Sequence, residues 1–139
     1  MPSTFLDTQT VTTSSRNQMI EVTDRLRKLL AKHKIVDGTM IVYVPHTTAA
    51  VTINENADPD VKHDMLLKLS AMIPKHEPGY QHSEGNSDSH VKTALVGNSV
   101  TVLIDQGRLL LGRWQGVYFC EFDGPREREM IVKVASFTE

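Results

Sequence analysis

Three apolar, β-branched runs separated by turns fill the carboxy-terminal part of the chain, and they constrain its fold more than any other feature. The runs cover residues 98–105, 116–122 and 129–137, and each has the composition of a β-strand. Gln106-Gly107 and Asp123-Gly124-Pro125 mark turns between them. Consecutive strands with short connections favour antiparallel pairing, because parallel strands need long crossovers.

Further strands are expected upstream. Residues 5–11 alternate loosely and turn at Ser14-Ser15, and residues 39–44 and 49–53 are two β-branched runs with Pro45 between them. We therefore predict an α+β fold, with mostly antiparallel, β-sandwich-like sheets and flanking helices. The length of 139 residues suits one domain over residues 1–139.

Three helices are expected to flank these strands. Apolar residues recur at helical spacing from Met19 to Leu30. A second helix starts at Asp58-Pro59, where the carboxylate caps free amides and the proline loses no internal hydrogen bond. We expect its buried stripe to comprise Val61, Met65, Leu69 and Met72. Asp88 or Ser89 caps a short third helix that ends at Gly97.

A polar segment between the second and third helices concentrates ligand-type side chains. Glu84, Asn86 and Asp88 occupy the even positions between His82 and His90. In an extended backbone these side chains would share one edge, because residues two apart face the same way. The segment is therefore either a solvated surface loop with two incidental histidines or a binding site.

A third histidine favours the site. His46 follows a strand-like run and is itself followed by Asn54, Glu55 and Asp58. Three imidazoles with nearby carboxylates meet the needs of a divalent transition metal. We predict that His46, His82 and His90 converge on one ion. The remaining histidines, which lie on a helix face or near lysines, are expected at the surface: His33, His63 and His76.

Composition narrows the class of protein. Apolar residues make up 40% of the chain and charged residues 23%, with a net charge of −2, which is ordinary for a globular protein and offers no basic field for nucleic acid. No window approaches a transmembrane span, so we expect no membrane partner. The single cysteine, Cys120, alternates like a strand side chain, which favours a packed thiol over a nucleophile. A cytoplasmic location follows as the default.

A second polar cluster lies near the carboxy terminus. Trp114 is either a core or interface residue or, with Gln115 beside it, the wall of a pocket for an aromatic ligand. Arg126 and Arg128 are two positions apart, so an extended backbone would aim both at one side. They suit phosphate binding, or equally salt bridges with nearby carboxylates that hold the turn.

Three spaced motifs carry a resemblance to a known family. PHTTAAVTINENADPDV, YQHSEGNSDSHVKTALVG and LLLGRWQGVYFCEFDGPRER, in that order, resemble the YjbQ family, often labelled secondary thiamine-phosphate synthase. The resemblance runs over nearly the whole chain and is densest from Pro45 to Arg128. Several motifs in one order are more specific than any one of them. The resemblance implies a compact α+β protein that assembles as a homotrimer and carries a metal-binding polar pocket.

These motifs give the expected site. The metal ligands are His46, His82 and His90, and the catalytic residues are Glu84, Asp88, Gln115 and Arg126. Substrate-binding residues are Thr47, Thr48, Asn54, Asn86, Trp114 and Arg128. Nitrogen ligands suit a zinc-like or manganese-like ion, with magnesium as a further option although it prefers oxygen. The expected partner is a small phosphorylated metabolite.

The resemblance implies a reaction, and the residues leave two alternatives open. The implied enzyme joins a thiazole phosphate to hydroxymethylpyrimidine diphosphate and expels pyrophosphate, whose charge a cation and arginines would stabilise. A metal-dependent hydrolase of a small phosphorylated metabolite would use the same histidines, with Glu84 or Asp88 as base. A non-catalytic trimer that binds a metabolite or metal would need the pocket but show no turnover.

Overall fold

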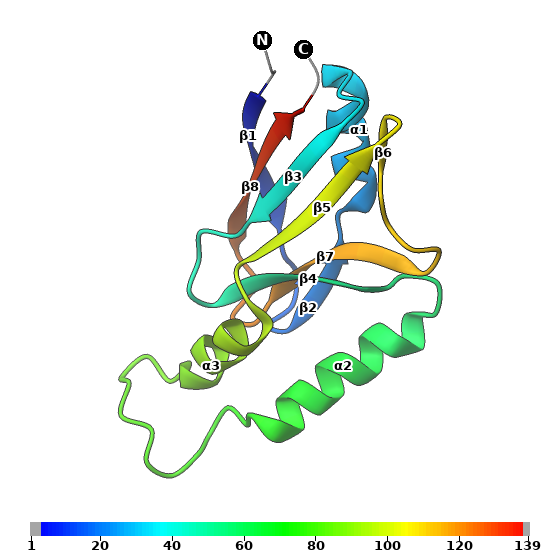
Figure 1. Cartoon of the computed structure of the whole chain (residues 1–139). Helices are drawn as coiled ribbons and strands as arrows, with labels where there is room; N and C mark the ends of the chain where they lie inside the picture. Colours follow the sequence, from blue (N-terminus) through cyan, green and yellow to red (C-terminus); the bar gives the residue numbers. More distant parts are fainter. Residues whose placement is uncertain (1–3, 138–139) are drawn as a thin grey trace.

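A computed structural model describes residues 4–137, which form eight strands and three helices in two antiparallel sheets (Figure 1). This architecture confirms the predicted α+β class. The larger sheet has five strands in the order β1-β8-β3-β5-β6. Their bounds are Thr4–Thr12 for β1, Glu127–Ser136 for β8, Gly38–Tyr43 for β3, Ser99–Asp105 for β5 and Arg108–Leu109 for β6.

The smaller sheet has three strands in the order β2-β7-β4. These strands are β2 at Gln18–Glu21, β7 at Gln115–Glu121 and β4 at Ala49–Glu55. Side chains from both sheets, such as Met40 and Phe119, share one buried core. The consecutive strands β3 and β4 do not pair with each other, because β3 lies between β5 and β8 while β4 pairs only with β7.

Helix α1 spans Thr23–His33 and is shorter than the sequence predicted. Leu26, Leu29 and Leu30 lie in the shared core, as their helical spacing indicated. Met19, which the same pattern placed in the helix, belongs to β2 instead and pairs with Cys120 on β7. The first residues of the apolar pattern therefore form β2, an edge strand of the smaller sheet, instead of the first turn of the helix.

Helix α2 spans Pro59–Met72, and its predicted stripe faces the protein at Val61, Met65 and Leu69 but is only half-buried and does not extend to Met72. None of its residues is fully buried, and Met72 is 54% exposed. The helix lies along one side of the molecule (Figure 1) and packs Met65, Leu66 and Leu69 against a small cluster on the smaller sheet. Only one side of this helix meets the protein, so its remaining apolar residues face outward.

Helix α3 spans Ser87–Val96. The predicted caps, Asp88 and Ser89, lie inside the helix instead of before it. Its N-cap is Asn86, so Asp88 and His90 lie in the first turns of a helix. The extended backbone that would align the even-numbered side chains of this segment is therefore not present. Residues 73–86 form the connection between α2 and α3 and contain no helix or strand.

Two further sequence expectations concern the interior and the surface. Cys120 is buried, and burial raises the pKa of its thiol to about 12, as expected for a packed, unreactive side chain. No helix within residues 4–137 is long and apolar enough to cross a membrane. On the larger sheet, large apolar side chains remain exposed on the outward face of β1, β3 and β5, and they are Leu6, Ile41, Tyr43 and Leu103.

Candidate functional site

The structure brings two of the three predicted metal ligands together. His82 comes from the α2–α3 connection and His90 from the first turn of α3. Their ring centres lie 5.5 Å apart, with the ring planes almost perpendicular. Two imidazoles that bind one ion tetrahedrally would have ring centres roughly 5 Å apart, because each metal–nitrogen bond is about 2.0–2.1 Å long. The spacing therefore permits a two-histidine metal site, and it is also that of an ordinary edge-to-face contact between aromatic rings.

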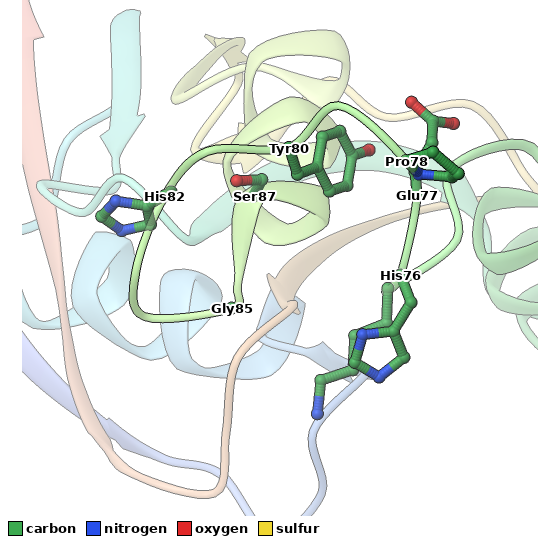
Figure 2. A pocket seen from close by; sticks show the side chains of 8 residues that line it. His76, Glu77, Pro78, Tyr80, His82, Gly85 and Ser87 are labelled. Carbon is green, nitrogen blue, oxygen red and sulfur yellow. The ribbon is translucent and has the colours of Figure 1, made fainter.

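Two adjoining hollows open beside this pair. One, of about 430 Å³, is lined by Tyr80, His82, Ser87, His90 and Val91. The other, of about 420 Å³, shares Tyr80, His82 and Ser87 with it and continues along the α2–α3 connection. Figure 2 shows this connection curling around the second hollow, with Tyr80 and Ser87 facing its interior. The histidine pair thus borders a space large enough for a small metabolite.

Glu84 lies close to the histidine pair. Its Oε2 is 3.6 Å from Nε2 of His82, and its side chain is 70% exposed. This distance is longer than a direct hydrogen bond, so a modest movement of the exposed side chain would make one. Glu84 is therefore available to orient His82 or to act as a base.

His46 lies at a different hollow, of about 370 Å³, which is lined by Thr10, His46, Glu127, Arg128 and Glu129. Its Nε2 accepts a hydrogen bond of 2.9 Å from the backbone N–H of Glu129. Pairing between β3 and β8 stops at Tyr43 and Ile131, because β3 ends there. Beyond that point the imidazole of His46, instead of a strand carbonyl, accepts the bond from the Glu129 N–H of β8. Burial, followed by the positive charge of Arg128, lowers the pKa of His46.

Of the three histidines predicted to converge, only His82 and His90 therefore lie together within one chain. Residues 4–137 contain no group of three or more His, Cys, Asp or Glu side chains arranged to hold a metal ion. A metal at His82 and His90 would leave coordination positions for water, substrate or a mobile carboxylate. Such open positions are a feature of catalytic rather than structural sites.

Asp88 lies in a buried ion cluster beneath the histidine pair. Its two oxygens accept hydrogen bonds of 2.9 and 3.0 Å from Arg16, and one also accepts a 3.2 Å bond from Lys92. Burial alone would raise the pKa of Asp88, but the bonds from Arg16 and Lys92 outweigh it and lower the pKa. With no exposed surface and both oxygens engaged, Asp88 is arranged to anchor α3 rather than to exchange protons with a substrate.

Asn86 and Arg126 meet at a third carboxylate, that of Asp123. The Asn86 amide donates a 2.8 Å hydrogen bond to Asp123, while its own Oδ1 is buried and without a partner. Arg126 makes a 2.9 Å ion pair with the same carboxylate, and its side chain is 49% exposed. The guanidinium is thus paired within its own turn, which matches the structural alternative foreseen from the sequence.

Arg128 points into the protein, away from the exposed Arg126. Its guanidinium bonds to both carboxylate oxygens of Glu121 and to the hydroxyl and carbonyl of Thr48. All three residues are buried. Burial would raise the pKa of Glu121, but hydrogen bonds from Arg128, the Asp123 N–H and Thr13 lower it. Arg128 therefore joins the start of β8 to the end of β7 through Glu121 and to the start of β4 through Thr48, while Thr47 is exposed.

Trp114 and Gln115 lie far from the histidine pair. Gln115 is the first residue of β7. The other end of β7 lies near His90, because the carbonyl of Phe122, just after β7, accepts a 2.6 Å bond from the hydroxyl of Ser89. Seven strand residues separate these ends by about 20 Å. Trp114 is 54% exposed and contacts the guanidinium of Arg113, and Asn54 pairs with β7 at the same distant end. Within one chain, Trp114, Gln115 and Asn54 therefore lie outside the site at His82 and His90.

Several residues around the site were missed by sequence reasoning. Lys92 follows Asp88 by one helical turn, a spacing that could have identified the ion pair. Arg16 carried no such signal, because it reaches Asp88 from a turn 72 positions earlier. Tyr80, Lys75 and His76 were not selected because their surroundings have no recognisable spacing.

Comparison with known sequences identifies the family. Residues 7–136 match the family model described as UPF0047 protein YjbQ-like. A UPF0047 protein of Methanocaldococcus jannaschii is 50% identical over 124 residues, covering 89% of each chain. The UPF0047 protein YugU of Bacillus subtilis is 46% identical over 130 residues, covering 94% of this chain and 98% of that one.

Solved structures agree with these matches. A YjbQ/UPF0047 family protein of Clostridium acetobutylicum has a TM-score of 0.90 at 46% identity, covering 92% of this chain and 98% of that one. A protein of unknown function from Sulfolobus solfataricus has a TM-score of 0.93 at 25% identity, covering 98% and 99%. Sequence and fold thus agree over nearly the full length, and the chain belongs to the YjbQ-like UPF0047 protein family.

Proposed function

We propose that this protein is a metal-dependent enzyme that acts on a small phosphorylated metabolite at the hollows beside His82 and His90. The single observation that carries the proposal is the 5.5 Å spacing of the two imidazole rings next to an open cavity. Paired nitrogen donors favour a zinc-like or manganese-like ion over magnesium. The bound ion would stabilise negative charge on a phosphate or activate water.

The protein's own residues take separate roles in this proposal. His82 and His90 hold the ion, and Glu84 orients His82 or accepts a proton from a reacting group. Tyr80 supplies a ring against which a flat ligand could stack, which is the role expected of Trp114 from its sequence context. Asp88 fixes the first turn of α3 and thereby His90.

The reaction implied by the family resemblance is that of a secondary thiamine-phosphate synthase. It would join a thiazole phosphate to hydroxymethylpyrimidine diphosphate and release pyrophosphate. The metal and nearby cations would stabilise the leaving pyrophosphate.

A metal-dependent phosphate-ester hydrolase is the second candidate. The observation that favours it is the position of Glu84, because an exposed carboxylate 3.6 Å from a metal-binding imidazole suits a base for water. A thiamine-phosphate synthase needs no such base for water. The two candidates share the metal and the phosphate, so they differ in the product that is released.

We also propose that the protein works as a homotrimer in the cytoplasm. The trimer follows from the family resemblance, and the exposed apolar side chains on the outer face of the larger sheet support it. The buried free thiol of Cys120 is consistent with a reducing compartment. A net charge of −2 gives no general attraction for nucleic acid.

The experiment uses protein that was purified without a histidine tag and stripped with a chelator. Zinc, manganese or magnesium is restored, and bound metal is measured by mass spectrometry. Turnover is then assayed with the two thiamine precursors and with a panel of phosphate esters. We expect zinc or manganese to bind and to restore turnover. We expect His82→Asn and His90→Asn to lose both metal and turnover without a change in melting temperature.

His63→Asn is the matched control, because His63 is an exposed histidine of α2 that lies outside both hollows. It should keep wild-type metal content. Release of pyrophosphate from the paired precursors supports the synthase, and release of phosphate from an ester supports the hydrolase. If His82→Asn and His90→Asn retain the metal, the proposed site is wrong. Metal binding without any turnover leaves a metal-binding trimer.

A further inference from the structure

The second hollow contains cationic groups that the proposed metal site does not use. Lys75 and His76 line it together with Glu77, Pro78 and the residues shared with the first hollow. Within residues 4–137, neither Lys75 nor His76 has a hydrogen-bond or ion-pair partner. Figure 2 shows His76 on one side of the hollow, across from Tyr80 and Ser87. Their charge and donors are therefore free for a ligand.

The arginines on this side of the molecule are already paired. Arg16 is bound to Asp88, Arg126 to Asp123 and Arg128 to Glu121. An anion that enters the hollows would therefore meet Lys75 and His76 rather than a guanidinium. A lysine ammonium is a compact charge that binds phosphate without the fixed geometry of arginine.

The start of α3 adds neutral donors beside these cations. The N-cap residue Asn86 makes no side-chain capping bond, and its carbonyl accepts bonds from the N–H groups of Ser89 and His90, which leaves the N–H groups of Ser87 and Asp88 uncapped by it. Ser87, the first helical residue, lines both hollows. Uncapped helix amides next to a lysine favour an anion with several oxygens.

We propose that the second hollow binds the phosphate or diphosphate group of the substrate, with Lys75 as its cationic donor and the imidazole N–H of His76 as a second donor. The inference rests on the proposed function, because the hollow shares Tyr80, His82 and Ser87 with the metal-binding one. A substrate would place its phosphate at Lys75 and the adjacent reacting group near His82 and His90. The ligand class is thus a phosphate monoester or a diphosphate with a flat ring.

The test measures binding of inorganic pyrophosphate to chelator-treated, tag-free full-length protein by titration calorimetry. We expect saturable binding that Lys75→Met weakens by about tenfold, because a charge-assisted bond is lost. Lys75→Arg should recover most of the affinity. Both variants should melt as the wild type does, since Lys75 is exposed.

Lys32→Met is the matched control. Lys32 lines another hollow on the basic face of α1, together with Arg25 and Lys28, where a purely non-specific anion would bind. This variant should keep wild-type affinity for pyrophosphate. Equal affinity of Lys75→Met and wild type, or weaker binding only in Lys32→Met, would overturn the inference.

A further variant separates the two proposals. His90→Asn should lose zinc yet still bind pyrophosphate, because His90 lines only the first hollow and Lys75 remains in the second. Wild-type protein that binds zinc but not pyrophosphate contradicts the phosphate subsite and leaves the metal site standing. Protein that binds pyrophosphate through Lys75 but takes up no metal supports the subsite and contradicts the proposed metal enzyme.

Discussion

Four charged side chains within residues 4–137 are almost fully buried, and each has a partner of opposite charge. Asp88 and Lys92 pair within α3, and Glu121 at the end of β7 pairs with Arg128 at the start of β8. A buried pair gains little net stability over apolar packing, but removal of one partner leaves an uncompensated charge. At the scale of the residue, these pairs therefore decide which substitutions the fold tolerates.

Arg128→Met tests this at the Glu121 pair. We expect a loss of about 3–5 kcal/mol in the free energy of unfolding, because Glu121 would remain buried without its cation. Urea denaturation followed by circular dichroism measures the loss. Arg126→Met is the control, since its ion pair with Asp123 is half exposed and should contribute about 1 kcal/mol or less. Equal losses in the two variants would contradict a structural role specific to Arg128.

His46 gives a prediction for pH. Burial and the charge of Arg128 lower its pKa in the folded protein, whereas the unfolded chain titrates near the ordinary value of about 6.5. The unfolded state therefore takes up this proton first as the pH falls, and stability decreases below about pH 6.5. His46→Gln, which keeps an acceptor for the Glu129 N–H but does not titrate, should lose this part of the decrease.

Unfolding free energies of wild type and His46→Gln, measured between about pH 5 and 8, check this prediction. The other histidines titrate alike in both proteins, so they cancel in the difference. The stability of the variant relative to wild type should rise as the pH falls. A difference that stays constant over this range would show that the lowered pKa does not act on stability.

At the scale of the element, α3 is held to the protein by its first turn. Arg16 bonds to Asp88 and to the hydroxyl of Ser89, and that hydroxyl donates to the carbonyl of Phe122. Lys92 reaches both Asp88 and Asn17. These bonds link α3 to the turn before β2 and to the end of β7. The position of His90 therefore depends on contacts made by its neighbours.

Asp88→Asn tests this attachment. We expect a loss of about 3 kcal/mol or more in unfolding free energy, because Arg16 and Lys92 would face each other without a carboxylate. Hydrogen exchange should show faster exchange in α3 than in the strands of the shared core. Glu84→Gln, an exposed acidic residue of the same segment, is the control and should change neither. Unchanged exchange in α3 of Asp88→Asn would show that other contacts hold the helix.

At the scale of the whole molecule, the outer face of the larger sheet mixes apolar, hydroxyl and charged side chains. Its exposed apolar residues stand among threonines and serines, with Lys133 beside Ile41 and with Glu127, Glu129 and Asp105 exposed at the ends of β8 and β5. Four strands of about six residues cover on the order of 400 Å². The whole face is therefore about half of one partner's share in a standard interface, and its apolar side chains form only part of it.

A trimer that uses this face should dissociate when charges are placed on it. We expect wild-type protein to have three times the chain mass of 15.6 kDa by light scattering, and Ile41→Lys combined with Leu103→Lys to give the monomer mass. Leu67→Lys on α2 is the control, because Leu67 is 62% exposed but lies on another surface. A trimer that survives the double substitution, or that Leu67→Lys disrupts, would exclude this face as the interface.

The sequence by itself determined the local elements and the family. Strand composition, the Asp58-Pro59 start of α2 and the turn at Gln106-Gly107 depend on short-range sterics and hydrogen bonds, which a sequence pattern records directly. The antiparallel α+β class followed from short connections, and the motif order indicated the family that the comparisons then showed. The buried character of Cys120 also followed from strand alternation.

Only the tertiary structure decided which polar residues meet. Spacing placed Asp88 and His90 on one extended edge, but α3 turns the first into the protein and leaves the second beside His82. The pairing of Arg128 with Glu121, and of Arg16 with Asp88, depends on contacts between distant segments. Such contacts are set by how sheets and helices pack, since desolvated charges must find partners wherever the fold brings them. No local pattern encodes that choice.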